Sequence, residues 1–136
     1  MPRAARTSSG GPSEAAARLN MARAYLETAD LVANERREGF SNVTAGLAIL
    51  AGIAASDAIC CVRLGRYHRG EDHRRATELL QAATPDGREL AIRLERLVGL
   101  KDTAHYGAAL VTPTNANLAV RWARQLVSRA QEELER

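Results

Sequence analysis

Apolar residues recur at helical spacing in the first part of the chain. Between Ser13 and about Arg37 they lie three and four residues apart, which is typical of one face of an amphipathic helix. This face contains Leu19, Ala22, Leu26, Ala29 and Ala33. Ser13 is a suitable residue to cap the start of the helix, and Arg36 to Gly39 are suited to end it.

The next segment, residues 43–62, is apolar on all sides and contains a single charged residue, Asp57. Ser41 or Asn42 is predicted to cap this helix, and Gly65 to follow its last turn. A stretch of this length could cross a membrane. Its alanine content, two glycines (Gly46 and Gly52) and Asp57 instead favour the buried central helix of a bundle, with glycines that let neighbouring helices approach closely.

Three further helices are predicted downstream. They cover residues 73–83 after Asp72 as N-cap, about 88–106, and 113 to the end after Thr112, with Leu118, Trp122, Leu126, Val127, Ala130 and Leu134 along the last one. We therefore predict an all-α protein, an up-and-down bundle of four long helices and one short helix. Residues 1–12 are predicted to be a disordered tail, residues 13–136 a single domain, and no strand of convincing length is expected.

Charge and cysteine content bear on the possible partners and the cellular location of the protein. The net charge of +3 permits nucleic acid as a partner without requiring it. Of the 19 basic residues only Lys101 is a lysine; codon bias explains an arginine excess but not why one position keeps Lys. Cys60 and Cys61 are adjacent on a helix, so no disulfide is expected. The polar start has no apolar signal segment, and we predict a cytoplasmic protein without membrane contact.

Lys101 and His105 form the first candidate site. They lie one turn apart and continue the spacing of Leu94, Leu97 and Val98, so they are predicted to lie on or beside the apolar face of their helix. A lysine in such a place snorkels to solvent, pairs with an acid or serves a site. Both a structural and a functional interpretation remain open.

Asp57 is the second candidate, because a carboxylate on the most buried helix needs a partner or takes up a proton. A structural interpretation pairs it with Ser56, a backbone group or a helix end. A functional interpretation pairs it with Lys101 or His105 in a cleft. The sequence does not choose between the two.

A third cluster lies around the loop after the central helix. Five arginines there, Arg63, Arg66, Arg69, Arg74 and Arg75, outnumber the acids Glu71 and Asp72. The cluster is interpreted first as a solvated loop and second as a phosphate-binding surface. A metal site made from His68, Glu71, Asp72 and His73 ranks third, and we predict no metal and no cofactor.

Four segments resemble the HEPN superfamily of small bacterial and archaeal helical bundles, and together they cover about residues 13–134. In chain order they read GLAILAGIAASDAICCVRLG, GEDHRRATELL, LERLVGLKDTAHYG and VTPTNANLAVRWARQLV. The resemblance implies a homodimer. It also implies either a metal-independent endoribonuclease of toxin–antitoxin or defence systems, or a non-catalytic nucleotide-binding module beside a nucleotidyltransferase.

The resemblance also suggests site residues. Lys101 falls where the family's Arg-x4-6-His ribonuclease motif has its arginine, His105 replaces an Asp of one subtype, and Tyr106 keeps that subtype's Tyr. Only three residues separate Lys101 from His105, and lysine lacks the planar fork of arginine. Whether the chain is an enzyme is therefore left open.

Two functional hypotheses follow. In the first, a homodimer binds nucleotide or RNA in a cleft lined by Lys101, His105, Tyr106 and Asp57. If it cleaves RNA, His105 acts as general acid or base and Lys101 stabilises charge on phosphorus. In the second, the chain is a non-catalytic interaction module, antitoxin-like or a partner of a nucleotidyltransferase, with Lys101 and Asp57 as a structural pair.

Overall fold

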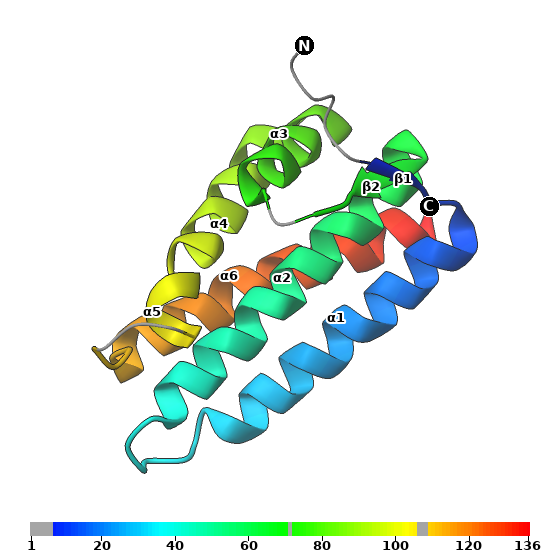
Figure 1. The fold of residues 1–136 in the computed structure, drawn as a ribbon. Helices are drawn as coiled ribbons and strands as arrows, with labels where there is room; N and C mark the ends of the chain where they lie inside the picture. The colour runs from blue at the N-terminus through cyan, green and yellow to red at the C-terminus, as the bar shows by residue number, and fades with distance from the viewer. Residues whose placement is uncertain (1–6, 71, 106–108) are drawn as a thin grey trace.

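The computed structural model describes residues 7–70, 72–105 and 109–136 as a bundle of helices with one short antiparallel strand pair. The elements in chain order are β1 (Thr7–Ser9), α1 (Pro12–Val32), α2 (Phe40–Leu64), β2 (Arg66–His68), α3 (His73–Ala83), α4 (Gly87–Gly99), α5 (Lys101–His105) and α6 (Pro113–Glu135). Helices α1 and α2 run in opposite directions, α4 and α5 run back along α2, and α6 returns beside it (Figure 1). The predicted all-α class is confirmed.

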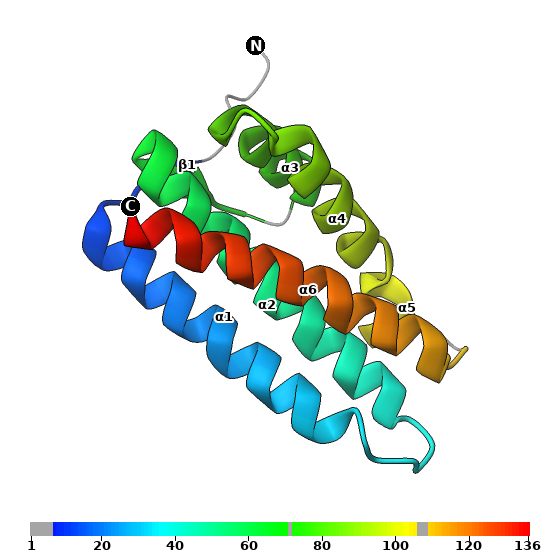
Figure 2. The ribbon, with the colours of Figure 1, turned by 180° about the vertical axis from the view of Figure 1, so that it is seen from behind.

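Helix α2 is the centre of the bundle. It packs against α1 on one side and α6 on another, with α3, α4 and α5 along its remaining length (Figures 1 and 2). Its composition would allow a membrane span, but 78% of its most apolar window is buried inside the protein, as in the core helix of a soluble bundle. A Cβ atom at Gly52 would lie 2.5 Å from Cδ1 of Leu97, which confirms that this glycine permits close helix packing.

The helix starts are only partly as predicted. Asp72 caps α3 by accepting a hydrogen bond from the Arg74 N–H, and the Thr112 hydroxyl accepts one from the Asn115 N–H at the start of α6. Helix α1, however, starts at Pro12 rather than after Ser13, because proline is preorganised for the first helical position and the Glu14 carboxylate accepts the Gly11 N–H at 3.0 Å.

The start of α2 also differs from the prediction. Gly39, with φ of 88°, caps α2 in place of Ser41 or Asn42. This left-handed backbone conformation is open to glycine at little energetic cost. The side chain of Asn42 is thereby left for contacts across the bundle.

The predicted helix over residues 88–106 is broken. Helix α4 ends at Gly99, and the Leu100 N–H donates to the carbonyls of Leu97 and Val98, so the chain tightens before α5 begins at Lys101. Residues on the two sides of this break no longer share one helical period. The helix break therefore removes the basis for predicting Lys101 and His105 on the same helix face as Leu94 and Leu97.

The prediction of an unstructured tail and no strands is wrong for residues 7–9. Strand β1 pairs antiparallel with β2, with Thr7 opposite His68, Ser8 opposite Tyr67 and Ser9 opposite Arg66. The Gly10 N–H donates to the Gly65 carbonyl at 3.0 Å, next to the pairing. Three-residue strands are too short to show alternation, and their partners lie about sixty residues away in sequence, so no local pattern signals them.

Candidate nucleic-acid site

Lys101 lies beside a histidine that the sequence did not connect with it. At the first residue of α5, Lys101 places its Nζ 3.0 Å from Nε2 of His73, the first residue of α3, in a partly buried contact. An ammonium group has donors only, so in this contact Lys101 donates and Nε2 of His73 accepts. The pair joins a fixed positive charge to an imidazole that can exchange a proton.

His105 lies one turn further along α5, against α2. A Cβ atom at Gly46 would lie 2.8 Å from Cε1 of His105, so the imidazole occupies the space that this glycine leaves. The His105 residue as a whole is exposed to solvent. Gly46 was predicted to let a neighbouring helix approach closely. The side chain that fills this space is His105, a candidate site residue, and not a core side chain.

Asn42 holds α5 in place and is a positioning residue that the sequence did not reveal. Its side-chain amide donates to the carbonyls of Thr103 and Ala104, at 3.2 and 3.4 Å, and its Oδ1 accepts the Val111 N–H at 3.0 Å. These bonds tie the short helix to the start of α2. The only hint in the sequence is a polar residue at the start of an apolar helix.

Asp57 does not join this group, and of its two open interpretations the functional one, pairing with Lys101 or His105, is wrong. Arg18 of α1 donates to its carboxylate at 2.6 Å, and Asp57 is 6% exposed. Asp57 lies eleven residues after Gly46, about 16 Å along the axis of α2. The acid is a structural partner of α1, at a different level of the bundle from His105.

Burial determines the protonation of Asp57. Desolvation raises the pKa of its carboxyl from 3.8 to about 6, although the charge and hydrogen bond of Arg18 act in the opposite direction. Burial acts in the same way on the neighbouring thiols, because desolvation raises the pKa of Cys60 to about 12 and that of Cys61 to about 11. Both cysteines are free thiols, as predicted, and are poor nucleophiles at neutral pH.

The predicted arginine cluster divides in two. Arg63 points into a structural network, donating to both carboxylate oxygens of Glu133 at 2.6 and 3.2 Å. The other four, Arg66, Arg69, Arg74 and Arg75, are exposed. Arg74 and Arg75 have only long surface ion pairs, of 3.8 Å, with Glu78 and Asp72. These four arginines remain available to phosphates; Arg63 has a structural role.

Glu133 is a buried acid that the sequence analysis did not single out. It is 1% exposed and accepts hydrogen bonds from Arg63 and from Arg129, which also donates to Asp86 in the turn before α4. The Arg63 hydrogen bond, with help from Arg129, lowers the pKa of Glu133 below its ordinary 4.5. The signal in the sequence that could have found it is its spacing: Glu133 lies seven residues after Leu126 and three after Ala130, on the buried face of α6.

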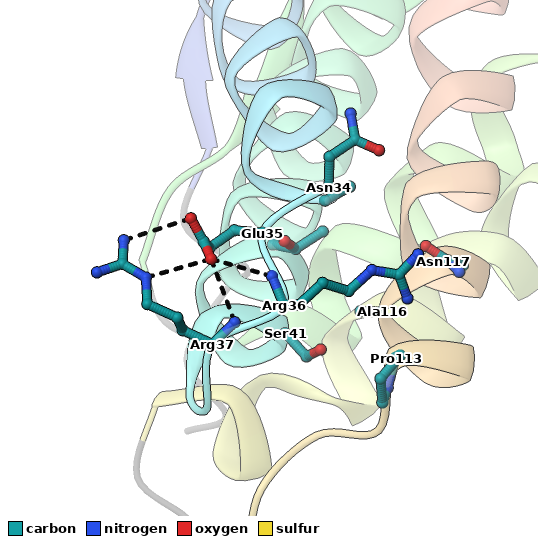
Figure 3. A pocket seen from close by; sticks show the side chains of 10 residues that line it. Asn34, Glu35, Arg36, Arg37, Ser41, Pro113, Ala116 and Asn117 are labelled. Atoms are coloured by element: carbon teal, nitrogen blue, oxygen red, sulfur yellow. Dashed lines mark hydrogen bonds and ion pairs between the residues drawn. The ribbon is translucent and has the colours of Figure 1, made fainter.

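The sequence did not indicate the hollows described next, which lie between described residues. One, of about 210 Å³, lies between the α1–α2 connection and the start of α6. Figure 3 shows Arg36 reaching across it towards Asn117, while Glu35 is held by Arg37 and by the N–H groups of Arg36 and Arg37. Glu35 therefore organises the connection between α1 and α2.

The other hollow is a groove between α4 and α6. Two adjoining cavities of about 290 and 460 Å³ share Glu89, Arg93, Arg121 and Gln125, so they form one continuous space. Trp122 lines it, with the guanidinium of Arg96 5.7 Å from its ring centroid. Trp122 was predicted as part of the apolar stripe of the last helix. It is half-buried, because the small residues Ala119 and Ala123 face the core.

Two predicted residues cannot be placed. Tyr106 and Glu71 lie outside the described residues. Within the described ranges, no three histidine, cysteine or acidic side chains are grouped to hold a metal ion. No known protein-family profile matches the chain, and no curated protein matches it either.

Proposed function

We propose that this chain is a small helical module that binds RNA or a nucleotide through phosphate contacts at Lys101, His73 and His105. The 3.0 Å contact between Lys101 and His73 carries the proposal. It sets a fixed positive charge beside a proton-exchanging group, and His105 lies one turn away on the same five-residue helix. This combination suits a phosphodiester, which offers negative oxygens and a reaction that needs proton transfer.

The exposed arginines support the same proposal. Arg69 lies four residues before His73 in the chain, and Arg74 and Arg75 follow it directly on the first turn of α3. A nucleic-acid backbone seated at Lys101 would therefore pass near several positive charges. Their contribution is independent of base sequence and falls with added salt.

The same groups can perform metal-independent cleavage of RNA. An imidazole acting as base takes the proton of a 2′-hydroxyl, and the 2′-oxygen attacks the adjacent phosphorus. The 5′-oxygen leaves with a proton from an imidazolium, which yields a 2′,3′-cyclic phosphate and a 5′-hydroxyl. Lys101 would stabilise the charge that develops on the phosphoryl oxygens. This is the activity that the HEPN resemblance suggests, with His73 in the place that the sequence analysis gave to Asp57.

A binding assay tests the proposal. Fluorescence anisotropy of a labelled single-stranded RNA at low salt should show binding, and Lys101→Ala should weaken it at least about tenfold, since a hydrogen bond to a charged group contributes about 1.5–3 kcal/mol. Arg23→Ala, which removes one positive charge from α1, serves as the matched control. No binding at low salt, or equal weakening by both variants, would refute the proposal.

An incubation with labelled RNA in the presence of EDTA tests cleavage. Cleavage that survives the chelator, leaves cyclic phosphate ends and is lost in both His105→Ala and His73→Ala supports the enzyme. Intact RNA bound by the wild-type protein restricts the function to binding.

A second candidate function is homodimerisation through the α1–α2 hairpin. Val43 and Leu50, two turns apart on one face of α2, are 49% and 39% exposed, and Met21 on the neighbouring α1 is 41% exposed. Apolar side chains grouped on one face are typical of protein interfaces. Light scattering on the wild type and on Leu50→Glu tests it: a dimer that the variant converts to a monomer supports this interface, and a wild-type monomer excludes it.

A further inference from the structure

The groove between α4 and α6 carries a set of side chains that neither the fold nor the site above uses. Its lining includes the only tryptophan of the sequence, Trp122, and three arginines, Arg93, Arg96 and Arg121, which we call the groove arginines. Figure 2 shows α6 lying alongside α4 on the back of the molecule. None of these residues belongs to the group around Lys101.

The groove arginines outnumber Glu89, the acid that lines the groove beside Trp122. The other two arginines of the groove have carboxylate partners: Arg124 pairs with Asp30 and Arg129 with Asp86. Arg93 donates only to the neutral amide oxygen of Gln125, at 2.6 Å. Across the described part of the chain, no groove arginine forms an ion pair. Three guanidinium groups on two facing helices therefore remain to bind an anion.

Trp122 adds an aromatic surface to this charge. It packs against the core with part of its side chain and remains half-exposed in the groove, where Arg96 lies over its ring. A half-exposed tryptophan flanked by arginines suits an unpaired base, which would stack on the ring in place of the Arg96 guanidinium, while Arg96 would turn to a neighbouring phosphate. A base inside a duplex has both faces covered and cannot stack in this way.

We propose that the groove between α4 and α6 is a binding site for single-stranded nucleic acid, in which Trp122 stacks on one unpaired base and the groove arginines neutralise the neighbouring phosphates. The site is separate from Lys101 and His73 and does not depend on the function proposed for them. The groove's combined cavity, of about 290 and 460 Å³, is within the range of sites that hold a small organic molecule, which accommodates one or two nucleotides.

Trp122 gives a direct readout, because the whole fluorescence of tryptophan in this protein comes from one residue. Titration of the full chain with a ten-nucleotide oligouridylate should quench this emission. Neutralisation of about three phosphates predicts a plot of log affinity against log salt with a slope of about −2 for a single strand. The same sequence in a duplex should leave the emission unchanged.

Variants test the assignment of each group. Replacing Arg96 and Arg121 together with alanine should weaken the quenching at least tenfold, whereas Glu89→Gln, which removes an acid from the same groove, should strengthen it. Trp122→Phe, followed by anisotropy of labelled RNA, should bind more tightly than Trp122→Leu. All of these side chains except Trp122 are exposed, so the arginine and glutamate variants should fold, and thermal unfolding checks this.

The outcomes separate this site from the one around Lys101. Quenching that survives in Lys101→Ala supports the groove, even if the proposal for Lys101 fails. Three results would overturn the groove proposal while leaving that for Lys101 standing. The first is RNA binding by anisotropy without any change in tryptophan emission. The others are quenching by duplex, or by polyglutamate, equal to that by the single strand.

Discussion

Two buried carboxylates, Asp57 of α2 beside α1 and Glu133 of α6 beside α2, have pKa values shifted in opposite directions. Asp57 on α2 has one arginine partner, and its pKa rises to about 6. Glu133 on α6 has two arginine partners and is even less exposed, yet its pKa falls. The comparison shows that the charge of a buried acid depends on the balance between desolvation and hydrogen bonds from arginine: desolvation prevails at Asp57, whereas the Arg63 hydrogen bond prevails at Glu133.

The two acids therefore make opposite contributions to stability as pH changes. Asp57 binds a proton more tightly in the folded state than in the unfolded chain, so its contribution is most favourable at low pH and is lost as pH rises from about 4 to about 6. Glu133 binds its proton less tightly when folded, so its contribution is present above pH 4.5 and is lost as the pH falls further.

The largest effect is expected from removing Glu133. Glu133→Ala leaves Arg63 and Arg129, whose side chains are 30% and 18% exposed, without their shared carboxylate, and we expect a loss of about 2–3 kcal/mol in the free energy of unfolding. Urea denaturation at pH 7 measures it. Glu132→Ala, one residue away and exposed, should change stability by less than about 0.5 kcal/mol. Equal effects of the two substitutions would contradict the structural role of Glu133.

Replacement of Asp57 tests the opposite pH response. The difference between its ordinary pKa of 3.8 and about 6 corresponds to about 3 kcal/mol of stability that the wild type loses between pH 4 and pH 7. Asp57→Asn should lose this dependence and leave a flatter curve of unfolding free energy against pH over that interval. A variant whose curve runs parallel to the wild type would show that Asp57 is not the group that titrates.

Removal of Arg18 should make Asp57 still harder to ionise. In Arg18→Met the carboxylate loses its arginine partner, and we expect a loss of about 1–2 kcal/mol at pH 7, limited because the acid can take up a proton. At pH 5, where Asp57 is mostly protonated already, the loss should be smaller. Unfolding curves at both pH values measure this, and an equal loss at both would argue against the assigned pair.

The smallest effect is expected at the outer end of the Glu133 network. Arg129 lowers the pKa of Asp86 to about 2, but the Asp86 side chain is 41% exposed and its charge is screened by water. Asp86→Asn should therefore reduce stability by less than about 1 kcal/mol. Thermal unfolding of this variant beside Glu133→Ala checks the ranking, and a larger effect for Asp86 would place the centre of the network in the turn before α4.

The periodic and capping signals of the sequence predicted most of the architecture. The buried central helix, the short α3 from 73 to 83, the Thr112–Pro113 start of α6 and the left-handed Gly65 all follow from local patterns of apolar residues and from backbone preferences. The break at Leu100 was not predicted, because a glycine inside an apolar periodic pattern is compatible with a continuing helix as well as with a helix end.

The side-chain partnerships required the tertiary structure. Lys101 and Asp57 were identified by type and position, but their partners, His73 and Arg18, lie 28 and 39 residues away, and no local spacing connects them. Tyr106 remains a prediction from the HEPN resemblance.

A sequence by itself determines which segments are helical and which faces are apolar, because these depend on neighbours within a few residues. That Glu133 would lie between two arginines, and that Trp122 would face a groove instead of the core, was decided only when α6 packed against α2 and α4. The physical reason is the distance along the chain over which each effect acts. Helical periodicity depends on residues within one or two turns, whereas ion pairing and side-chain exposure depend on residues that only the folded chain brings together.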